Sequence, residues 1–182
     1  MIPGKEVRLR AIEREDIPRF VRWMNDPDVI QFLLMSSPLS TAMEEKWFEK
    51  QLERPPYQGQ ILAIEVLQGQ DWVHIGNTDL RDADPVSRTA EFGIVIGEKA
   101  FWNKGYGTRA TRLMVKHGFE NLNLNRIFLT VFANNPRAIK AYQSAGFTQE
   151  GILRQGIYKN GRYQDLILMS VLRSDWMNFE DK

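Results

Sequence analysis

The fold of this chain is decided by Trp102-Asn103-Lys104-Gly105-Tyr106-Gly107-Thr108. An apolar run that ends in Ile94-Val95-Ile96 precedes this stretch, and a helical pattern follows it as far as Leu122. The sequence therefore predicts a strand, a glycine turn and a helix whose first backbone N–H groups have no partner within the helix. Such a helix start attracts anions, and glycines let the backbone approach a phosphate closely.

Four interpretations of this turn compete: a dinucleotide site, a P-loop, a simple helix-entry turn and a phosphate site. The spacing Gly105-x-Gly107-x-x-Ala110 fits a loose dinucleotide fingerprint, which requires an acid at the end of the next strand to hold a ribose. That strand ends in Phe132-Ala133-Asn134-Asn135, without an acid, so a nucleotide-dependent oxidoreductase is disfavoured. The turn is not a P-loop, because the lysine precedes the glycine. A simple helix-entry turn remains open beside a phosphate site.

A second pattern lies downstream and consists of Asn135, Ala138, Tyr142 and Gly146-Phe147. Asparagine at the N-cap, proline in the first turn and glycine just past the end predict a helix over 135–145. Offsets of three and four residues place Asn135, Ala138 and Tyr142 on one helical face. The tyrosine is either a core residue with a satisfied hydroxyl or a group that reaches a ligand at the sheet edge that holds the glycine turn.

Around these patterns the chain predicts an α/β fold with a mixed sheet and helices on both of its faces. We expect the order β-α-α-β-β-β-α-β-α-β-β in a single domain over residues 1–182, in which only the central strand–helix–strand needs a parallel crossover. A loop is expected over 54–59, and Thr41 is expected to cap the second helix. The predicted strands are 7–12, 61–67, 72–80, 89–96, 126–133, 147–158 and 163–172, and the predicted helices are 15–25, 41–53, 107–122 and 135–145.

Composition excludes several classes of protein. The 182 residues are 43% hydrophobic and 26% charged, as is usual for a globular domain, and they include no cysteine. Disulfides, thiolate nucleophiles and thiolate metal sites are thereby excluded. The start of the chain lacks the apolar core of a signal peptide, and the longest apolar runs are too short to span a bilayer. We expect a cytoplasmic protein that does not contact membranes.

Charge is unevenly distributed although the net charge is only +1. Residues 99–140 hold eight basic side chains and one acid, whereas residues 60–98 hold seven acids and two arginines. A local positive field beside a glycine turn favours a polyanionic ligand, although chance clustering of surface charge explains it as well. The basic residues are not interleaved with exposed-looking aromatic side chains or with a known reading motif, so nucleic acid is not an expected partner.

These motifs, in this order and at these spacings, resemble the GCN5-related N-acetyltransferases over residues 7–172. The family's coenzyme A loop has the pattern Arg/Gln-x-x-Gly-x-Gly/Ala, from which Trp102 departs at the first position. That departure, with the tail Glu150-Gly151-Ile152-Leu153-Arg154 and Asn160-Gly161-Arg162-Tyr163-Gln164-Asp165, is similar to the subgroup of ribosomal-protein N-terminal and spermidine acetyltransferases. The resemblance implies acetyl-CoA as co-substrate, no metal, and two central strands that splay apart around the pantetheine. The cofactor residues that it implies are Ile94, Val95, Ile96, Asn103, Lys104, Gly105, Tyr106, Gly107, Thr108, Asn135, Ala138 and Tyr142.

The resemblance also implies a mechanism in which an amine attacks the thioester directly. Without cysteine, no acyl–thiol enzyme intermediate can form. Tyr142 is the expected acid for the departing thiolate, and Glu91 is the candidate base for the amine proton, beside the alternatives of a water chain or a merely ion-paired carboxylate. His74 and His117 are expected to be structural.

The acceptor stays open at this level. A polyamine such as spermidine, a protein N-terminal amine, an amino sugar and an aminoglycoside all fit an N-acetyltransferase. A non-catalytic acyl-CoA-binding or sensing domain is the alternative from another class, and Tyr142 argues against it because a pure binder needs no acid. Exposed apolar positions in the terminal hairpin favour a homodimer.

Overall fold

Seven strands form one mixed sheet in the part of the chain that the computed structural model describes, residues 1–35, 38–55 and 61–180. The strand order is β1-β2-β3-β4-β5-β7-β6, and β4–β5 is the parallel pair. This arrangement confirms the mixed sheet and the central crossover expected from the sequence. The strands are β1 Val7–Ala11, β2 Ile61–Gln68, β3 Asp71–Asp84, β4 Thr89–Ile96, β5 Arg126–Phe132, β6 Thr148–Lys159 and β7 Arg162–Leu172.

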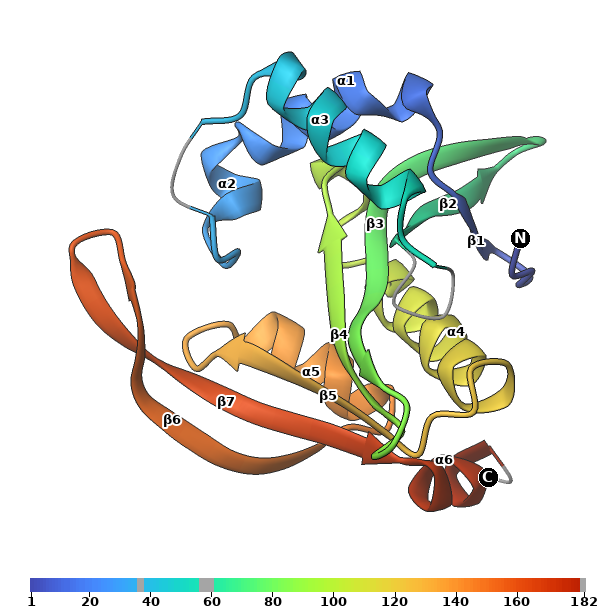
Figure 1. The fold of residues 1–182 in the computed structure, drawn as a ribbon, viewed down its shortest axis with the longest axis vertical. Coiled ribbons are helices and arrows are strands. Elements are labelled where there is room, and N and C mark those ends of the chain that lie inside the picture. Colours follow the sequence, from blue (N-terminus) through green and yellow to red (C-terminus); the bar gives the residue numbers. More distant parts are fainter. Residues whose placement is uncertain (36–37, 56–60, 181–182) are drawn as a thin grey trace.

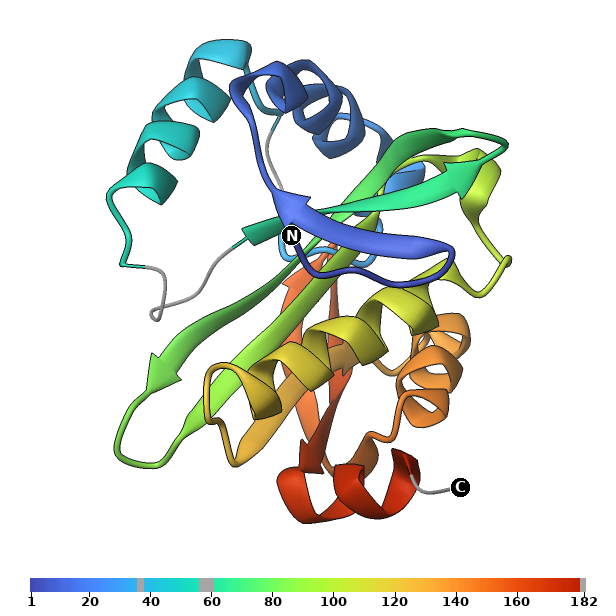
Figure 2. The ribbon, with the colours of Figure 1, turned by 90° about the vertical axis from the view of Figure 1, so that its right-hand side faces the viewer.

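The helices fall into two groups at opposite ends of the molecule (Figures 1 and 2). One group precedes β2, and the other follows β4. The first comprises η1 Arg14–Asp16, α1 Ile17–Met24, α2 Pro27–Ile30 and α3 Thr41–Leu52. The second comprises α4 Tyr106–Glu120, α5 Pro136–Ser144 and α6 Arg173–Glu180. The short helix η3 Lys99–Phe101 also follows β4 but lies beside α2, because the Lys99 ammonium pairs with Asp26 and Asp28.

The parallel pairing of β4 with β5 ends after three residues. Thr89–Glu91 pair with Arg126–Phe128, and no pairing joins the two strands beyond Glu91 in the described structure. On its other side β5 pairs with β7 along its whole length, from Arg126 to Phe132. Figure 1 shows β4 rising away from β5 while β7 and β6 continue beyond it. We call this unpaired region, between Phe92–Ile96 and Leu129–Phe132, the β4–β5 divergence; it confirms the expected splay.

Alternation along β4 divides its side chains between two cores. Phe92, Ile94 and Ile96 belong to the main core, which α4 covers. Val95 points to the other side and packs with Phe20 and Trp23 of α1. We call these two sides the α4 face and the α1 face; because successive strand residues alternate, Glu91 and Gly93 lie on the α1 face with Val95.

Close packing in the main core explains one glycine of α4. A Cβ atom on Gly118 would lie 2.7 Å from the Ile127 Cδ1 and 2.9 Å from the Leu80 Cδ1, so a larger residue there would force these methyl groups to move. The buried side of α4 also includes Val115 and Phe119, whereas His117 is only partly buried.

Two local predictions need correction, and a third is largely untested. The second helix is capped by Ser40, whose hydroxyl accepts from the N–H of Met43, because the backbone is extended at Ser40 and already helical at Thr41. The third strand continues to Asp84 rather than ending at residue 80. The turn after it is made by the Asp84 carboxylate, which accepts from the backbone N–H groups of Val86 and Ser87. The loop predicted over 54–59 lies largely outside the described residues.

Two short helices were not predicted. The Asp26 side chain accepts from the N–H of Asp28 and starts α2, where the sequence indicated only a stop. The helix α6 packs through buried Trp176 against Phe119, and Arg173 donates to the Leu124 carbonyl at the end of the α4 segment. Both depend on contacts with distant segments, which periodicity within a window cannot show.

Candidate active site

The start of α4 presents free backbone donors. Gly105 is the N-cap, with a φ of +77°, and it offers no side chain to cap the helix. The first bond back to this cap runs from the Arg109 N–H to the Gly105 carbonyl, at 3.1 Å. The N–H groups of Tyr106, Gly107 and Thr108 therefore precede the helical ladder and can bind an anion, which the helix dipole also favours.

Gly107 leaves open space above this turn. A Cβ atom built on it would find its nearest neighbour, Ile96 Cγ1, at 3.9 Å, an ordinary contact distance. Nothing in the fold therefore requires glycine at this helical position, where alanine is intrinsically favoured. The space is suited to a ligand that approaches the backbone, as the sequence predicts.

The basic residues around the turn have unequal roles. Arg109 donates to the Lys104 carbonyl at 3.1 Å and pairs with Glu6 at 3.4 Å, so it braces the turn from behind. Arg137 stacks over the ring of Trp102, with 4.4 Å between the guanidinium carbon and the ring centroid. The Lys104 ammonium lies 5.4 Å from the centroid of Phe101 on an exposed side chain. Among these residues Lys104 is the best placed to meet a phosphate.

The backbone of β4 has one edge that faces β3 and one that faces the β4–β5 divergence. The Gly97 N–H donates to the carbonyl of Ile75 in β3. In an antiparallel pair every second residue of a strand bonds to the partner strand, so the backbone groups of Val95 and Gly93 also bond to β3. Ile94 and Ile96 then direct their backbone groups into the divergence. The indole N–H of Trp102 donates to the Ile96 carbonyl at 2.7 Å, so this carbonyl already has a partner. The predicted cofactor contact thus rests on Ile94 and on the N–H of Ile96, with Val95 contributing packing.

Tyr142 stands at the point where β4 leaves β5. Its ring is 6.1 Å from Phe92 and 6.0 Å from Phe147 between centroids, on the α4 face. The side chain is half-buried, and its hydroxyl has no hydrogen-bond partner among the residues described. Burial raises the pKa of Tyr142 to about 12. The hydroxyl is therefore protonated at neutral pH and free to donate to a ligand.

The helix that carries Tyr142 is fixed at both ends. Asn135 accepts from the N–H of Ala138 at 3.2 Å, as an N-cap, and it is buried. Arg112 of α4 donates to the Ser144 carbonyl at 3.2 Å. Asn135 acts here as a helix cap, and Ala138 packs against the main core. These contacts hold α5 in place, and a direct part of either residue in cofactor binding stays a prediction.

Carboxylates gather on the α1 face beside the divergence. Glu91 of β4 lies opposite Arg81 of β3, whose guanidinium Nε is 3.4 Å from its carboxylate. Asp79 lies opposite Gly93, and a Cβ atom on Gly93 would come within 2.2 Å of the Asp79 Oδ1. The missing side chain thus lets this carboxylate lie over β4.

Asp79 is a candidate that the sequence alone did not single out. Burial raises the pKa of its carboxyl, and the neighbouring charge of Glu91 adds to the rise while that of Arg81 opposes it. A carboxylate with a raised pKa, next to a site that binds a cation, is suited to accept a proton. Only the cross-strand register with Gly93 reveals this position.

A separate buried acid is Glu44, on the inward side of α3 with Trp47 and Phe48. It is 7% exposed and has no hydrogen-bond or ion-pair partner in the described part of the chain. Burial raises the pKa of Glu44. An unpaired buried carboxylate is stabilised by an incoming cation.

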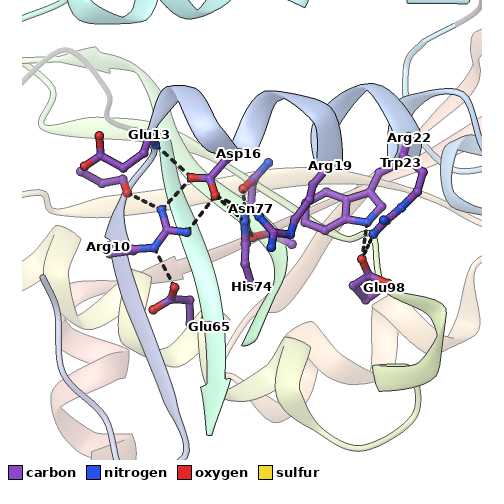
Figure 3. A network of polar contacts seen from close by, with 12 residues as sticks. Arg10, Glu13, Asp16, Arg19, Arg22, Trp23, Glu65, His74, Asn77 and Glu98 are labelled. Carbon is purple, nitrogen blue, oxygen red and sulfur yellow. Dashed lines mark hydrogen bonds and ion pairs between the residues drawn. The ribbon is translucent and has the colours of Figure 1, made fainter. Parts of the chain in front are cut away.

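His74 is held in a polar network and is not free to act as a base (Figure 3). Its Nδ1 lies 3.0 Å from Asp16, and its Nε2 lies 3.0 Å from both the Gly76 carbonyl and the Asn77 side chain. Asp16 also accepts two hydrogen bonds from Arg10, which bonds Glu65 in turn. The network ties β1, η1 and β3 together beneath α1. His117 is half-buried in α4, and burial lowers its pKa.

The end of β4 is also fixed by α1. A Cβ atom on Gly97 would lie 2.1 Å from the ring of Trp23, so glycine is required for the indole to lie against the chain there. The Trp23 N–H donates to Glu98 at 3.1 Å, as Figure 3 shows. These contacts set the position of the segment that leads into the glycine turn.

Within the described ranges, no group of three or more histidine, aspartate or glutamate side chains is arranged to hold a metal ion. None of the helices in the described part has the length and apolar character needed to cross a membrane.

Comparison with known proteins agrees with this geometry. The family model for the acetyltransferase (GNAT) domain matches residues 6–148. A spermidine N(1)-acetyltransferase from Vibrio cholerae is 30% identical over 176 residues, which cover 96% of this chain and 98% of that protein. A putative ribosomal N-acetyltransferase, YdaF from Bacillus subtilis, is 37% identical over 101 residues, 56% of this chain and 55% of that one. The crystal structure of the V. cholerae spermidine N-acetyltransferase in complex with CoA and spermine superposes with a TM-score of 0.87 at 28% identity, covering 96% of this chain and 100% of that chain.

Proposed function

Because the chain belongs to the GNAT acetyltransferase family and transfers an acetyl group from acetyl-CoA to an amine, we propose that its acceptor is a polyamine of the spermidine class. The observation that carries the proposal is the likeness along nearly the whole chain to proteins named spermidine N-acetyltransferase. Asp79, Glu91 and Glu44 supply the carboxylates that a polycationic amine requires.

We propose that the diphosphate of the co-substrate binds the N–H groups of Tyr106, Gly107 and Thr108, with Asn103, Lys104 and Gly105 shaping the turn. The exposed ammonium of Lys104 adds a charge-assisted contact. The pantetheine then occupies the β4–β5 divergence, where the backbone groups of Ile94 and Ile96 are directed. One of these N–H groups polarises the thioester carbonyl as negative charge develops on its oxygen.

Glu91 and Asp79 are the candidates for taking the proton from the incoming ammonium. Glu91 shares Arg81 with Asp79, and this ion pair holds its charge in place. Asp79 has the raised pKa, which suits a base that must be regenerated near neutral pH. We propose that the amine is bound between them and loses its proton to Asp79 or, through water, to Glu91.

Tyr142 is the proposed acid. Its pKa of about 12 lies well above the ordinary thiol value of about 8.5, so complete proton transfer to a thiolate is uphill by roughly 5 kcal/mol. Hydrogen-bond donation to the developing thiolate needs no such transfer. A cation bound nearby also lowers the pKa of a phenol. Tyr142 therefore stabilises the leaving group first and gives up its proton late.

A protein N-terminal amine is the second candidate acceptor, because the likeness to the ribosomal acetyltransferase covers 101 residues at higher identity. A peptide would contact the exposed side of the β6–β7 hairpin as well as the carboxylates. Amino sugars and aminoglycosides remain chemically possible acceptors without an observation that favours them.

The decisive experiment is an amine panel with detection of released thiol. The chain contains no cysteine, so every thiol detected comes from the co-substrate. The panel contains spermidine, spermine, an N-terminal peptide, glucosamine and an aminoglycoside, with Tyr142→Phe as the low-activity control. Preferred turnover of spermidine or spermine supports the proposal. Preferred turnover of the peptide, or release of no thiol with any amine, contradicts it.

We also propose that residues 1–182 form one domain and that two copies associate through the terminal hairpin. Ile152 and Leu153 are 54% and 46% exposed, and Tyr158 and Tyr163 are more than 60% exposed. Sedimentation of the protein and of an Ile152→Lys variant tests the association. The cytoplasmic location expected from the sequence stays a prediction.

A further inference from the structure

Lys159, at the tip of the β6–β7 hairpin, reaches a segment that lies far away in sequence. Its ammonium donates to the carbonyl of Ile30 at 2.6 Å, to that of Met35 at 3.0 Å and to that of Leu33 at close range. An ammonium has three N–H donors, and all three are used. The side chain is only 8% exposed.

The three carbonyls belong to the turn that follows α2, and we call residues 30–35 the bridging segment. Carbonyls at the end of a helix lack partners within it, and a lysine ammonium is well suited to satisfy them. Burial lowers the pKa of Lys159, and the three carbonyl dipoles hold the charged form in place. The Lys159 ammonium therefore joins three carbonyls of the bridging segment, of which that of Ile30 also accepts from the Leu33 N–H at 3.0 Å.

One side of the bridging segment is attached to β4. Val29, just before it, packs with Phe20 and Trp23 in the cluster that includes Val95. The ammonium of Lys99, just after β4, pairs with Asp26 at 2.8 Å and Asp28 at 2.9 Å.

The other side is attached to β5 and the hairpin. The ring centroids of Phe32 and Phe132 are 5.8 Å apart, and Phe132 is the last residue of β5. Lys159 supplies the contact with β6. The bridging segment thus connects two strands that have no pairing with each other beyond Glu91 in the described structure.

We propose that Lys159 is a positioning residue for acetyl transfer: by holding the bridging segment across the β4–β5 divergence, it fixes the amine-binding side of the site. None of these contacts involves the backbone N–H groups of Tyr106, Gly107 and Thr108, where the diphosphate is proposed to bind. Loss of the ammonium therefore affects the amine and leaves acetyl-CoA binding in place. The inference rests on the proposed amine site on the α1 face.

The absence of native cysteine allows a test that restores the ammonium chemically. In Lys159→Cys the introduced thiol is the single one in the chain, and its thiolate displaces bromide from 2-bromoethylammonium to give a side chain of lysine's length and charge. Methyl methanethiosulfonate caps the same thiol without charge. Lys116→Cys, at an exposed position on α4, is labelled in parallel as the control.

For the methyl-capped protein we expect kcat/KM for the amine to fall by about tenfold or more, with KM for acetyl-CoA changed by less than about twofold. Aminoethylation restores the amine kcat/KM, and neither label affects the Lys116 control. The proposal is overturned if methyl-capped protein keeps full amine kcat/KM, or if aminoethylation restores nothing.

Amide exchange over residues 30–35, measured without any amine, separates this inference from the choice of acceptor. Faster exchange in the methyl-capped protein, reversed by aminoethylation, supports the role of the Lys159 ammonium in holding the bridging segment. Unchanged exchange overturns that role. A panel in which polyamines are not acetylated contradicts the proposed acceptor alone, and the kinetic test is then made with the amine that is turned over.

Discussion

The ring of Tyr142 meets the ring of Phe92 edge-on, with centroids 6.1 Å apart and planes at 85°, one residue beyond the last pairing between β4 and β5. The phenol is thereby anchored on α5 at the base of the β4–β5 divergence. Its hydroxyl is left without a partner among the described residues, in surroundings that keep it protonated. This one contact links the topology of the sheet to the proposed acid.

Tyr142→Phe should lower kcat by about a hundredfold, the usual size of a general acid's contribution. The affinity for acetyl-CoA should stay within about twofold, and stability should be nearly unchanged, because no described hydrogen bond is lost. Turnover and calorimetric titration measure the two quantities, with Tyr163→Phe on the exposed hairpin as control. Unaltered turnover would remove Tyr142 as the acid.

Gly107→Ala should weaken acetyl-CoA binding by about tenfold or more, since the added methyl group occupies the space proposed for the diphosphate. The melting temperature should stay the same or rise, because alanine is favoured over glycine in a helix by up to about 1 kcal/mol. Gly151→Ala, where a Cβ atom would also find open space, is the matched control. Equal affinities for Gly107→Ala and the wild type would contradict the phosphate turn.

Asp79→Asn and Glu91→Gln should have different effects on the acidic limb of the plot of kcat/KM against pH. A base acts when deprotonated, so activity falls as pH drops through its pKa, and the raised pKa of Asp79 puts that limb above the ordinary value of about 4. Asp79→Asn removes the limb if Asp79 is the base. Glu91→Gln then moves it to lower pH, because the Glu91 charge raises the pKa of Asp79.

The opposite pattern identifies Glu91 as the base: the limb disappears in Glu91→Gln and survives in Asp79→Asn. Identical profiles for both variants and the wild type would leave water as the base and contradict both assignments.

Asp16→Asn should destabilise the fold by about 3 kcal/mol at neutral pH, as expected when one partner of a buried ionic network is removed. Burial alone raises the pKa of Asp16, but the hydrogen bonds from Arg10 and His74 outweigh it and hold the pKa well below its usual range. The ionised carboxylate therefore stabilises the fold fully above about pH 4 and loses this effect as pH falls further.

Urea unfolding of Asp16→Asn and wild type at pH 7 and pH 3 measures this difference, which should shrink at the lower pH. Glu120→Gln, in an exposed pair with Lys116, should cost less than about 0.5 kcal/mol at either pH. A constant difference between Asp16→Asn and the wild type across this range would show that the charge of Asp16 is not what stabilises the network.

Local signals were sufficient for most of the fold. The glycine turn, the Asn135 cap and the strand over residues 89–96 each depend on signals within a few residues, and the structure has all three where the sequence predicts them. The parallel crossover follows from the strand–helix–strand order. Short helices such as α2 and α6 escaped prediction, because one depends on a single capping carboxylate and the other on burial of Trp176 against Phe119.

The site was harder to predict where it depends on register. The position of Asp79 over Gly93 follows from cross-strand pairing. The same register directs the backbone hydrogen bonds of Val95 to β3. The contacts of Lys159 join residues more than 120 positions apart. Sequence spacing carries no information on such distances, whereas Tyr142 and Gly107 lie in motifs that are themselves local.

The central claim is that acetyl-CoA lies in the β4–β5 divergence with its diphosphate on the first amides of α4. A crystal structure with bound CoA tests this most directly. The account predicts diphosphate oxygens within hydrogen-bond distance of the N–H groups of Tyr106–Thr108, and the thiol beside the Tyr142 hydroxyl. A coenzyme bound elsewhere, with β4 and β5 closed together beyond Glu91, would contradict it.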